Sequence, residues 1–211
     1  MADSKDLEIK QGKTFSLVLR WETEPIVYKP ITAISLANGA PRLTFASAHG
    51  TPNGWRGAVT RVKGMTQINA KNSPPRASDY VTATVLSPTE IELNGVTPCD
   101  DSGTEWSDYT SGGFWQYNTP VDLAGYTARM KIKDKIGGTV LASTEAGDSP
   151  LDILLIAIDN NAKTITLSIA ATATDDITWT KGIYDLEMVS GSGVVTTILS
   201  GKVTVTKEVT T

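Results

Sequence analysis

The sequence predicts an all-β fold in which a β-sandwich is interrupted by a small inserted β-barrel. Thr, Val and Ile are frequent, and these β-branched residues favour strands over helices. Short runs that alternate apolar and polar residues are separated by Gly, Pro and Asn, the usual pattern of strands joined by turns. The chain has 211 residues, which is enough for one large β domain or two small ones.

The first alternating run predicts a half-buried strand near the N-terminus, following an earlier pair formed by Leu7 and Ile9. The apolar positions of this run are Phe15, Leu17, Leu19 and Trp21. The positions between them are mostly polar, so one face of the strand should lie against a core and the other in solvent.

A second strand is predicted after Pro120, with one apolar and one basic face. The apolar face carries Tyr126, Ala128, Met130 and Ile132, and the other face carries Thr127, Arg129, Lys131 and Lys133. We expect the apolar face to belong to the core and the basic face to be solvated.

The rest of the C-terminal half predicts a hairpin, a short helix and further strands. Residues 153–158 and 165–169 should form the hairpin around a turn at 159–161. Residues 170–176 are the only passage with a helical pattern. The remaining predicted strands cover residues 184–188, 194–198 and 203–205, with a turn at 190–193.

The segment between Pro30 and Gln116 has its own short strands and predicts a small inserted barrel. These strands are expected at residues 31–36, 42–46, 57–62, 80–86 and 90–93. The flanking strands need one another to bury their apolar faces, because two or three strands alone are marginally stable. We therefore predict one discontinuous sandwich made of two host segments, residues 1–29 and 117–211, and interrupted by residues 30–116.

Composition argues against several classes of function. The net charge of −4 and the pI near 5.0 provide no broad positive field for nucleic acid. His49 and Cys99 are the only residues of their types, which excludes an internal disulfide and a Cys/His zinc cluster. The longest apolar run, 153–158, is too short to span a membrane. We expect no cofactor, no metal, no membrane contact and no enzymatic activity.

Two isolated reactive residues are interpreted as structural. His49 lies in a turn with no nucleophile motif nearby, so a turn role is favoured over catalysis. Cys99 is followed by two carboxylates, and an activated thiolate needs a positive rather than a negative field. The acidic group around it lacks the spacing of a calcium loop and is interpreted as solvated. Its members are Asp100, Asp101, Glu105 and Asp108.

An aromatic group just before the second host segment is the strongest candidate site. Its members are Trp106, Tyr109, Phe114, Trp115 and Tyr117. Such side chains either pack a junction between two domains or form a surface that binds a partner or a sugar. Junction packing is favoured, and the binding surface remains the alternative.

The host segments resemble structural proteins of tailed bacteriophages. The similarity is centred on Asp122-Leu123-Ala124-Gly125-Tyr126-Thr127-Ala128-Arg129-Met130, which departs from the family pattern at Ala124, where Thr is usual. Residues 9–15, 177–179, 182–187 and 201–205 are also similar to segments of that family. The resemblance implies an immunoglobulin-like sandwich used in virion assembly.

The insert resembles the β-barrel named after the first catalytic-cysteine half-domain of ubiquitin-activating enzymes, which recurs in phage proteins. The similarity lies in residues 48–50, 53–55, 63–69 and 109–113. Together the two resemblances imply a non-enzymatic adaptor or peripheral protein of the tail, collar or baseplate. Its partners would be other virion proteins, in several symmetric copies, and it would be made in the host cytoplasm. A capsid decoration protein and a module that binds host glycan are the alternatives.

Overall fold

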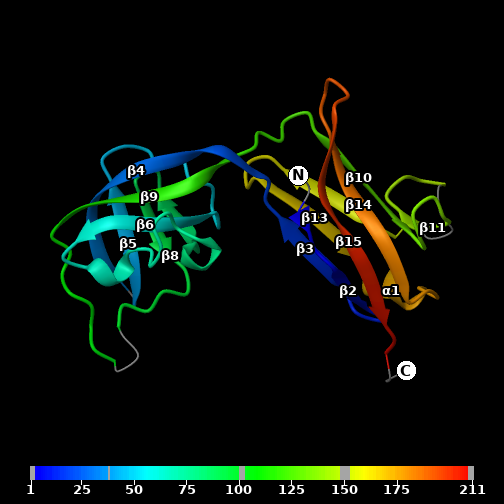
Figure 1. Ribbon diagram of the computed structural model, residues 1–211, viewed down its shortest axis with the longest axis horizontal. Helices are drawn as coiled ribbons and strands as arrows, with labels where there is room; N and C mark the ends of the chain where they lie inside the picture. The colour runs from blue at the N-terminus through cyan, green and yellow to red at the C-terminus, as the bar shows by residue number, and fades with distance from the viewer. Residues whose placement is uncertain (1–2, 38, 100–102, 148–152, 209–211) are drawn as a thin grey trace. The chain divides into compact units, whose positions relative to one another are not determined.

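The computed structural model is an all-β protein made of two compact units (Figure 1). It describes residues 3–37, 39–99, 103–147 and 153–208. One unit joins Met1–Trp21 to Asp122–Thr211, and the other is Glu22–Val121. The boundaries expected from the sequence, after residues 29 and 116, fall within two long strands that pair with each other. These strands are β4 (Glu22–Ala37) and β9 (Ser111–Pro120).

The larger sheet of the first unit contains six strands. Its central strands β14 (Lys181–Val189) and β15 (Val195–Thr206) are antiparallel, and β10 (Thr127–Lys133) pairs with the other side of β14. Strand β11 (Val140–Ser143) follows β10 at one edge. The short strands β1 (Asp3–Ser4) and β2 (Leu7–Lys10) both run parallel to β15.

A three-stranded sheet completes this unit. Its order is β12 (Leu155–Asp159), β13 (Thr164–Ile169) and β3 (Phe15–Leu19), all antiparallel. The predicted hairpin is confirmed, and the Asp159 carboxylate stabilises its turn by accepting hydrogen bonds from the amides of Asn161 and Ala162. The predicted helix is confirmed as α1 (Ala171–Asp175).

The two sheets of the first unit share one apolar core. Met130 and Leu186 from the larger sheet are buried in the same cluster as Leu167 and Ile169 from the smaller sheet. The expected alternation therefore holds in β10, where Met130 and Ile132 are buried and the residues between them lie on the opposite face. This arrangement is a β-sandwich.

Tyr184 ties the N-terminal segment to this sandwich. Its hydroxyl donates a hydrogen bond to the carbonyl oxygen of Lys5 at 2.7 Å. Burial, with smaller contributions from Asp6 and Asp185, raises the pKa of Tyr184 to about 12 from 10.0. The neutral phenol is thus the form that the folded state favours.

We expect alkaline pH to weaken the fold through this residue. The unfolded chain releases the phenol proton near pH 10.0 and the folded chain near about 12, so stability is lost as pH rises across that interval. Denaturant unfolding of wild type and Tyr184→Phe across this range measures the effect. At neutral pH the variant should lose about 0.5–1.5 kcal/mol with the hydrogen bond. Parallel pH profiles for the two proteins would contradict the assignment.

The second unit is a closed barrel with strand order β4-β5-β8-β7-β6-β9. The remaining members are β5 (Ala40–Phe45), β6 (Arg56–Lys63), β7 (Val81–Ser87) and β8 (Glu90–Leu93). The five strands expected in the insert are confirmed: β5, β6, β7 and β8 agree within two residues at each end, whereas β4 begins nine residues earlier than expected, at Glu22. The sequence did not predict β9, because Gly112 and Gly113 suggested a bend rather than the start of a strand.

Asp79 organises the long connection between β6 and β7. Its carboxylate accepts hydrogen bonds from the backbone amides of Arg76 at 2.8 Å and Lys71 at 3.0 Å, and from the Asn72 side chain at 2.9 Å. These bonds, led by that of Arg76, hold the pKa of Asp79 below its ordinary value of 3.8. The connection also contains the 3₁₀ turns at Thr66–Ile68 and Ala77–Asp79.

We expect this connection to loosen in acid. The stabilisation by ionised Asp79 is present above the unfolded pKa of 3.8 and is lost as pH falls through the lower folded value. NMR hydrogen exchange at the amides of Lys71 and Arg76 should therefore accelerate in that interval. Asp79→Asn is the control, because it removes the titrating group and should abolish the acid-dependent change. Acceleration that persists unchanged in Asp79→Asn would contradict the prediction.

Candidate functional site

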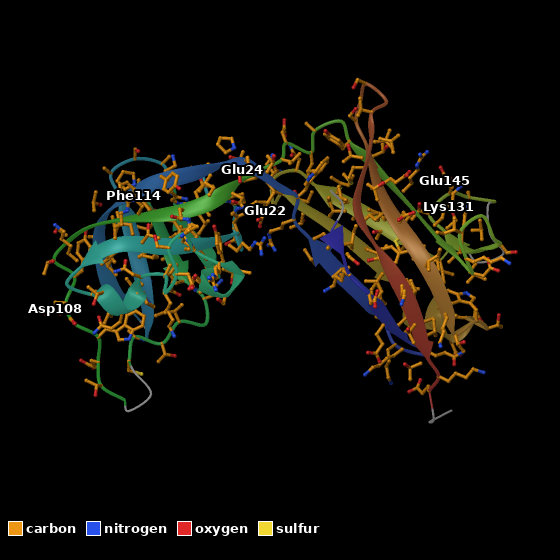
Figure 2. All side chains as sticks on the ribbon, in the orientation of Figure 1. Glu22, Glu24, Asp108, Phe114, Lys131 and Glu145 are labelled. Carbon is orange, nitrogen blue, oxygen red and sulfur yellow. The ribbon has the colours of Figure 1, made fainter. Side chains whose placement is uncertain are left out.

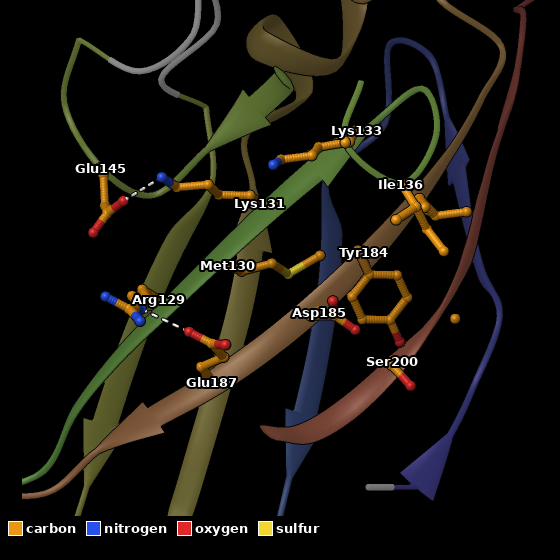
Figure 3. A pocket seen from close by; sticks show the side chains of 13 residues that line it. Arg129, Met130, Lys131, Lys133, Ile136, Glu145, Tyr184, Asp185, Glu187 and Ser200 are labelled. Carbon is orange, nitrogen blue, oxygen red and sulfur yellow. Dashed lines mark hydrogen bonds and ion pairs between the residues drawn. The ribbon is translucent and has the colours of Figure 1, made fainter. Parts of the chain in front are cut away.

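The outer face of the larger sandwich sheet carries a groove of about 520 Å3 (Figure 3). Strands β10, β14 and β15 form its floor, and the turn after β10 places Ile136 at its rim with 91% of the side chain exposed. Alternate residues of β10 and β14 project into it, because every second side chain of a strand lies on the same face. The polar residues are Arg129, Lys131, Lys133, Glu145, Asp185, Glu187 and Ser200.

Ion pairs fix much of this face. Arg129 Nε lies 2.7 Å from Glu187 Oε2, and Lys131 Nζ lies 2.7 Å from Glu145 Oε2. The hydrogen bond and charge of Glu187 raise the pKa of Arg129 above its ordinary value. The basic face expected for β10 is therefore opposed by carboxylates from β14 and from the segment after β11.

The charges of this face are fixed in ion pairs and alternate in sign. Such an arrangement can complement a polar protein surface and set its register. Pairs this exposed contribute little to folding, with typical values of about 0–1 kcal/mol. They can therefore be changed without loss of the fold.

His49 has a structural position in the barrel. The amide of Thr51 donates a hydrogen bond to Nδ1 at 2.9 Å, which leaves Nε2 to donate to the carbonyl oxygen of Ser87 at 2.9 Å. The side chain is 2% exposed. Both ring nitrogens thus form hydrogen bonds with the backbone of the barrel.

Two members of the aromatic group form hydrogen bonds to the loop of His49 and Thr51 from inside the barrel. Trp115 is 0% exposed and its Nε1 donates to Thr51 Oγ1 at 3.0 Å. Tyr117 is 3% exposed and its hydroxyl donates to the His49 carbonyl oxygen at 2.7 Å. Their rings belong to the barrel core and have no surface to offer a sugar or a partner.

The structure does not bring the five aromatic residues together on one surface. Trp106 and Tyr109 are half-buried and pack against the barrel core. The Tyr109 hydroxyl donates to backbone, with the Gly112 carbonyl oxygen at 3.1 Å. Phe114 lies on the outer wall of the barrel (Figure 2). Its ring meets that of Tyr28 edge to face. Phe114 is therefore the member of the group that lies at a surface depression.

The acidic loop near Cys99 provides no metal centre in the part of the chain that the structure describes. Cys99 is a free, half-buried cysteine whose backbone bridges to that of Glu105. Asp100 and Asp101 lie outside the described residues. Among the residues that are described, no group of three or more His, Cys, Asp or Glu could hold a metal ion.

Sequence reasoning missed the groove on β10, β14 and β15 and the depression beside Phe114. The groove could be anticipated only by pairing the basic face of β10 with the alternating acids of β14, since neither strand reveals it alone. The helical segments within the described ranges are also too short or too polar to cross a membrane.

Two comparisons with known proteins gave no match. No protein-family model matches the chain, and no curated protein matches it. The function proposed below is therefore based on the residues themselves and on the geometry of the two units.

Proposed function

We propose that this protein is a non-enzymatic structural component of a tailed-phage virion, an adaptor or peripheral protein of the tail, collar or baseplate. The resemblance of the host segments to phage structural proteins supports this proposal. So does the resemblance of residues 48–50, 53–55, 63–69 and 109–113 to a barrel that recurs in phage proteins. In this proposal the sandwich is the immunoglobulin-like module of that family.

The observation that carries the proposal is the contrast between the two units. The barrel is closed, whereas both sheets of the sandwich are open and, among the described residues, end in strands with one unpaired side. Such edges offer main-chain donors and acceptors to a strand of another chain. Strands β12 and β3 are the edges of the smaller sheet, and they expose Leu155 to 63% and Val18 to 50%.

Repeated copies would make such weak contacts sufficient. An open edge and a charged face bind modestly as single surfaces, but many copies in a closed symmetric assembly bind together with high avidity. The groove on β10, β14 and β15 would determine the register of a neighbouring subunit through its fixed ion pairs.

Fractionation of particles tests this proposal. Particles that carry the gene are purified, separated into heads and tails, and analysed by quantitative mass spectrometry. We expect the protein in the tail fraction, at a constant ratio to the major tail proteins. Recovery with heads alone would instead support a capsid decoration protein. Absence from both fractions would exclude a virion component.

A further inference from the structure

The outer wall of the barrel carries a second depression, a cleft of about 710 Å3. Strands β4, β6 and β9 form one side, and the connection organised by Asp79 forms the other. This volume lies in the range of roughly 300–1,000 Å3 that is common for sites holding small molecules. The residues that matter to the inference are Tyr28, Arg61, Asn72, Tyr80, Phe114 and Gln116.

Aromatic rings from three segments border the cleft. Tyr28 on β4 and Phe114 on β9 meet edge to face, with centroids 6.3 Å apart. Tyr28 is 55% exposed although it lies mid-strand in the barrel wall. Tyr80 approaches from the opposite segment, with the guanidinium of Arg56 5.8 Å from its ring centroid. Exposed ring faces of this kind stack on flat, partly apolar ligands.

Arg61 lies on β6 at a local break in the pairing with β9. Thr60 pairs with Phe114 and Val62 pairs with Gly112, so the register is unchanged and Arg61 stands opposite Gly113. Its φ of 60° is in the left-handed region, which is unfavourable for a residue with a side chain. On the opposite strand Gly113, with φ 97°, permits the close approach, because a Cβ there would overlap Val62. Strain of this kind is often retained where a side chain must be aimed at a ligand.

The polar groups of the cleft favour an anion. Arg61 is the only charged residue among those that line it. The Arg61 side chain is exposed and has no ion-pair partner among the described residues. The nearby Asp79 carboxylate is already occupied by three donors of its own loop. An incoming carboxylate would therefore meet an unpaired guanidinium.

Oriented side-chain amides add hydrogen-bonding capacity. Gln116 is 4% exposed, and its Oε1 lies 3.5 Å from the Thr60 hydroxyl. Its Nε2 group has no partner among the described residues and can donate to a ligand hydroxyl. Asn72 is held in place by its bond to Asp79 at 2.9 Å.

The rings, the amide and the cation of the cleft indicate which class of ligand it suits. Peptides that join β proteins commonly do so by pairing with a free strand edge, and the closed barrel has none. Stacking rings, a fixed amide and a single cation instead match a sugar ring that carries an acidic group. We propose that this cleft binds an acidic saccharide, with Arg61 pairing its carboxylate and Tyr28 and Phe114 contacting the sugar face. The proposal goes beyond virion assembly and does not depend on it.

Calorimetric titration with matched sugars tests the site. Oligogalacturonate is compared with its methyl ester, which keeps the sugar and removes the charge, and hyaluronan fragments and oligosialic acid extend the acidic set. We expect saturable binding of at least one acidic sugar, and binding of the ester weaker by at least about tenfold. Poly-glutamate tests for an acidic peptide.

Variants locate the binding. Arg61→Gln and Arg61→Gly should each weaken binding by at least about tenfold, and the glycine variant should be as stable as wild type or more so because it relieves the positive φ. Tyr28→Ala should also weaken binding without unfolding the barrel. Lys63→Gln, which removes the same charge from an exposed position on the same strand, should bind normally.

Three outcomes would overturn the proposal. No acidic sugar binds saturably, or poly-glutamate binds more tightly than every sugar, or Lys63→Gln loses as much affinity as Arg61→Gln. Each outcome leaves the assignment to the virion unaffected, because that assignment is measured in particles.

Discussion

Replacing Trp115 by Ala should destabilise the barrel by about 3–5 kcal/mol, the usual cost of deleting a large aromatic side chain from a packed core. The Trp115 side chain is 0% exposed. It packs so closely on Gly57 that a Cβ at that position would overlap the ring. Its loss would leave a cavity and would also remove the donor to Thr51 Oγ1. Denaturant unfolding followed by circular dichroism measures the change.

Trp115→Phe separates the two contributions. Phe retains most of the ring volume but lacks the N–H group that bonds Thr51, so it should cost less than Ala. Tyr28→Ala is the surface control, because 55% of that side chain is already exposed. A loss below about 1 kcal/mol for Trp115→Ala would show that the ring does not support the barrel core.

Leu167→Ala should destabilise the sandwich by about 2–5 kcal/mol. Leu167 is 0% exposed at the centre of β13, which pairs with β12 on one side and β3 on the other. Its side chain packs among residues of both sheets, so a cavity there would weaken the contact between them. Native-state hydrogen exchange at the amides of β13 and β14 measures the loss directly.

Leu155→Ala is the matched control for this prediction. The residue has the same type on the neighbouring strand β12, but it is 63% exposed, so its truncation should cost less than about 1 kcal/mol. Equal losses from Leu155→Ala and Leu167→Ala would contradict the assignment of the core.

Because the two units have separate cores, each substitution should destabilise mainly the unit that contains it. The buried clusters of the sandwich and the barrel have no residue in common among the described side chains. Hydrogen exchange should therefore accelerate mainly in the barrel for Trp115→Ala and mainly in the sandwich for Leu167→Ala.

The strands that could be predicted from sequence are those with one core face. In β10 and β13 every second residue is apolar, and all of these except the half-buried Ala128 are buried, so periodicity alone identifies the two strands. Strand β9 breaks this rule, because Trp115, Gln116 and Tyr117 are buried in succession. The alternation is obscured because Gln116 is buried although it lines the cleft, whereas Trp115 and Tyr117 are buried in the core.

The surfaces were less predictable than the strands. Trp115 and Phe114 are adjacent aromatic residues in the sequence, yet one fills the core and the other faces the outside, and only the register of β9 distinguishes them. Arg61 carried no signal in sequence because its exposure to the cleft depends on its positive φ and on its position opposite Gly113 in the pairing of β6 with β9. The ion pair of Arg129 with Glu187 likewise depends on strand pairing between residues far apart in the chain.

A cryo-EM reconstruction of the particles that contain this protein tests the proposed role most directly. We expect both units at repeated, symmetry-related positions on the tail, collar or baseplate. In these positions β12 or β3 should contact another chain along its open edge. Particles that assemble fully without density for either unit would contradict the proposal that this protein is a structural part of the virion.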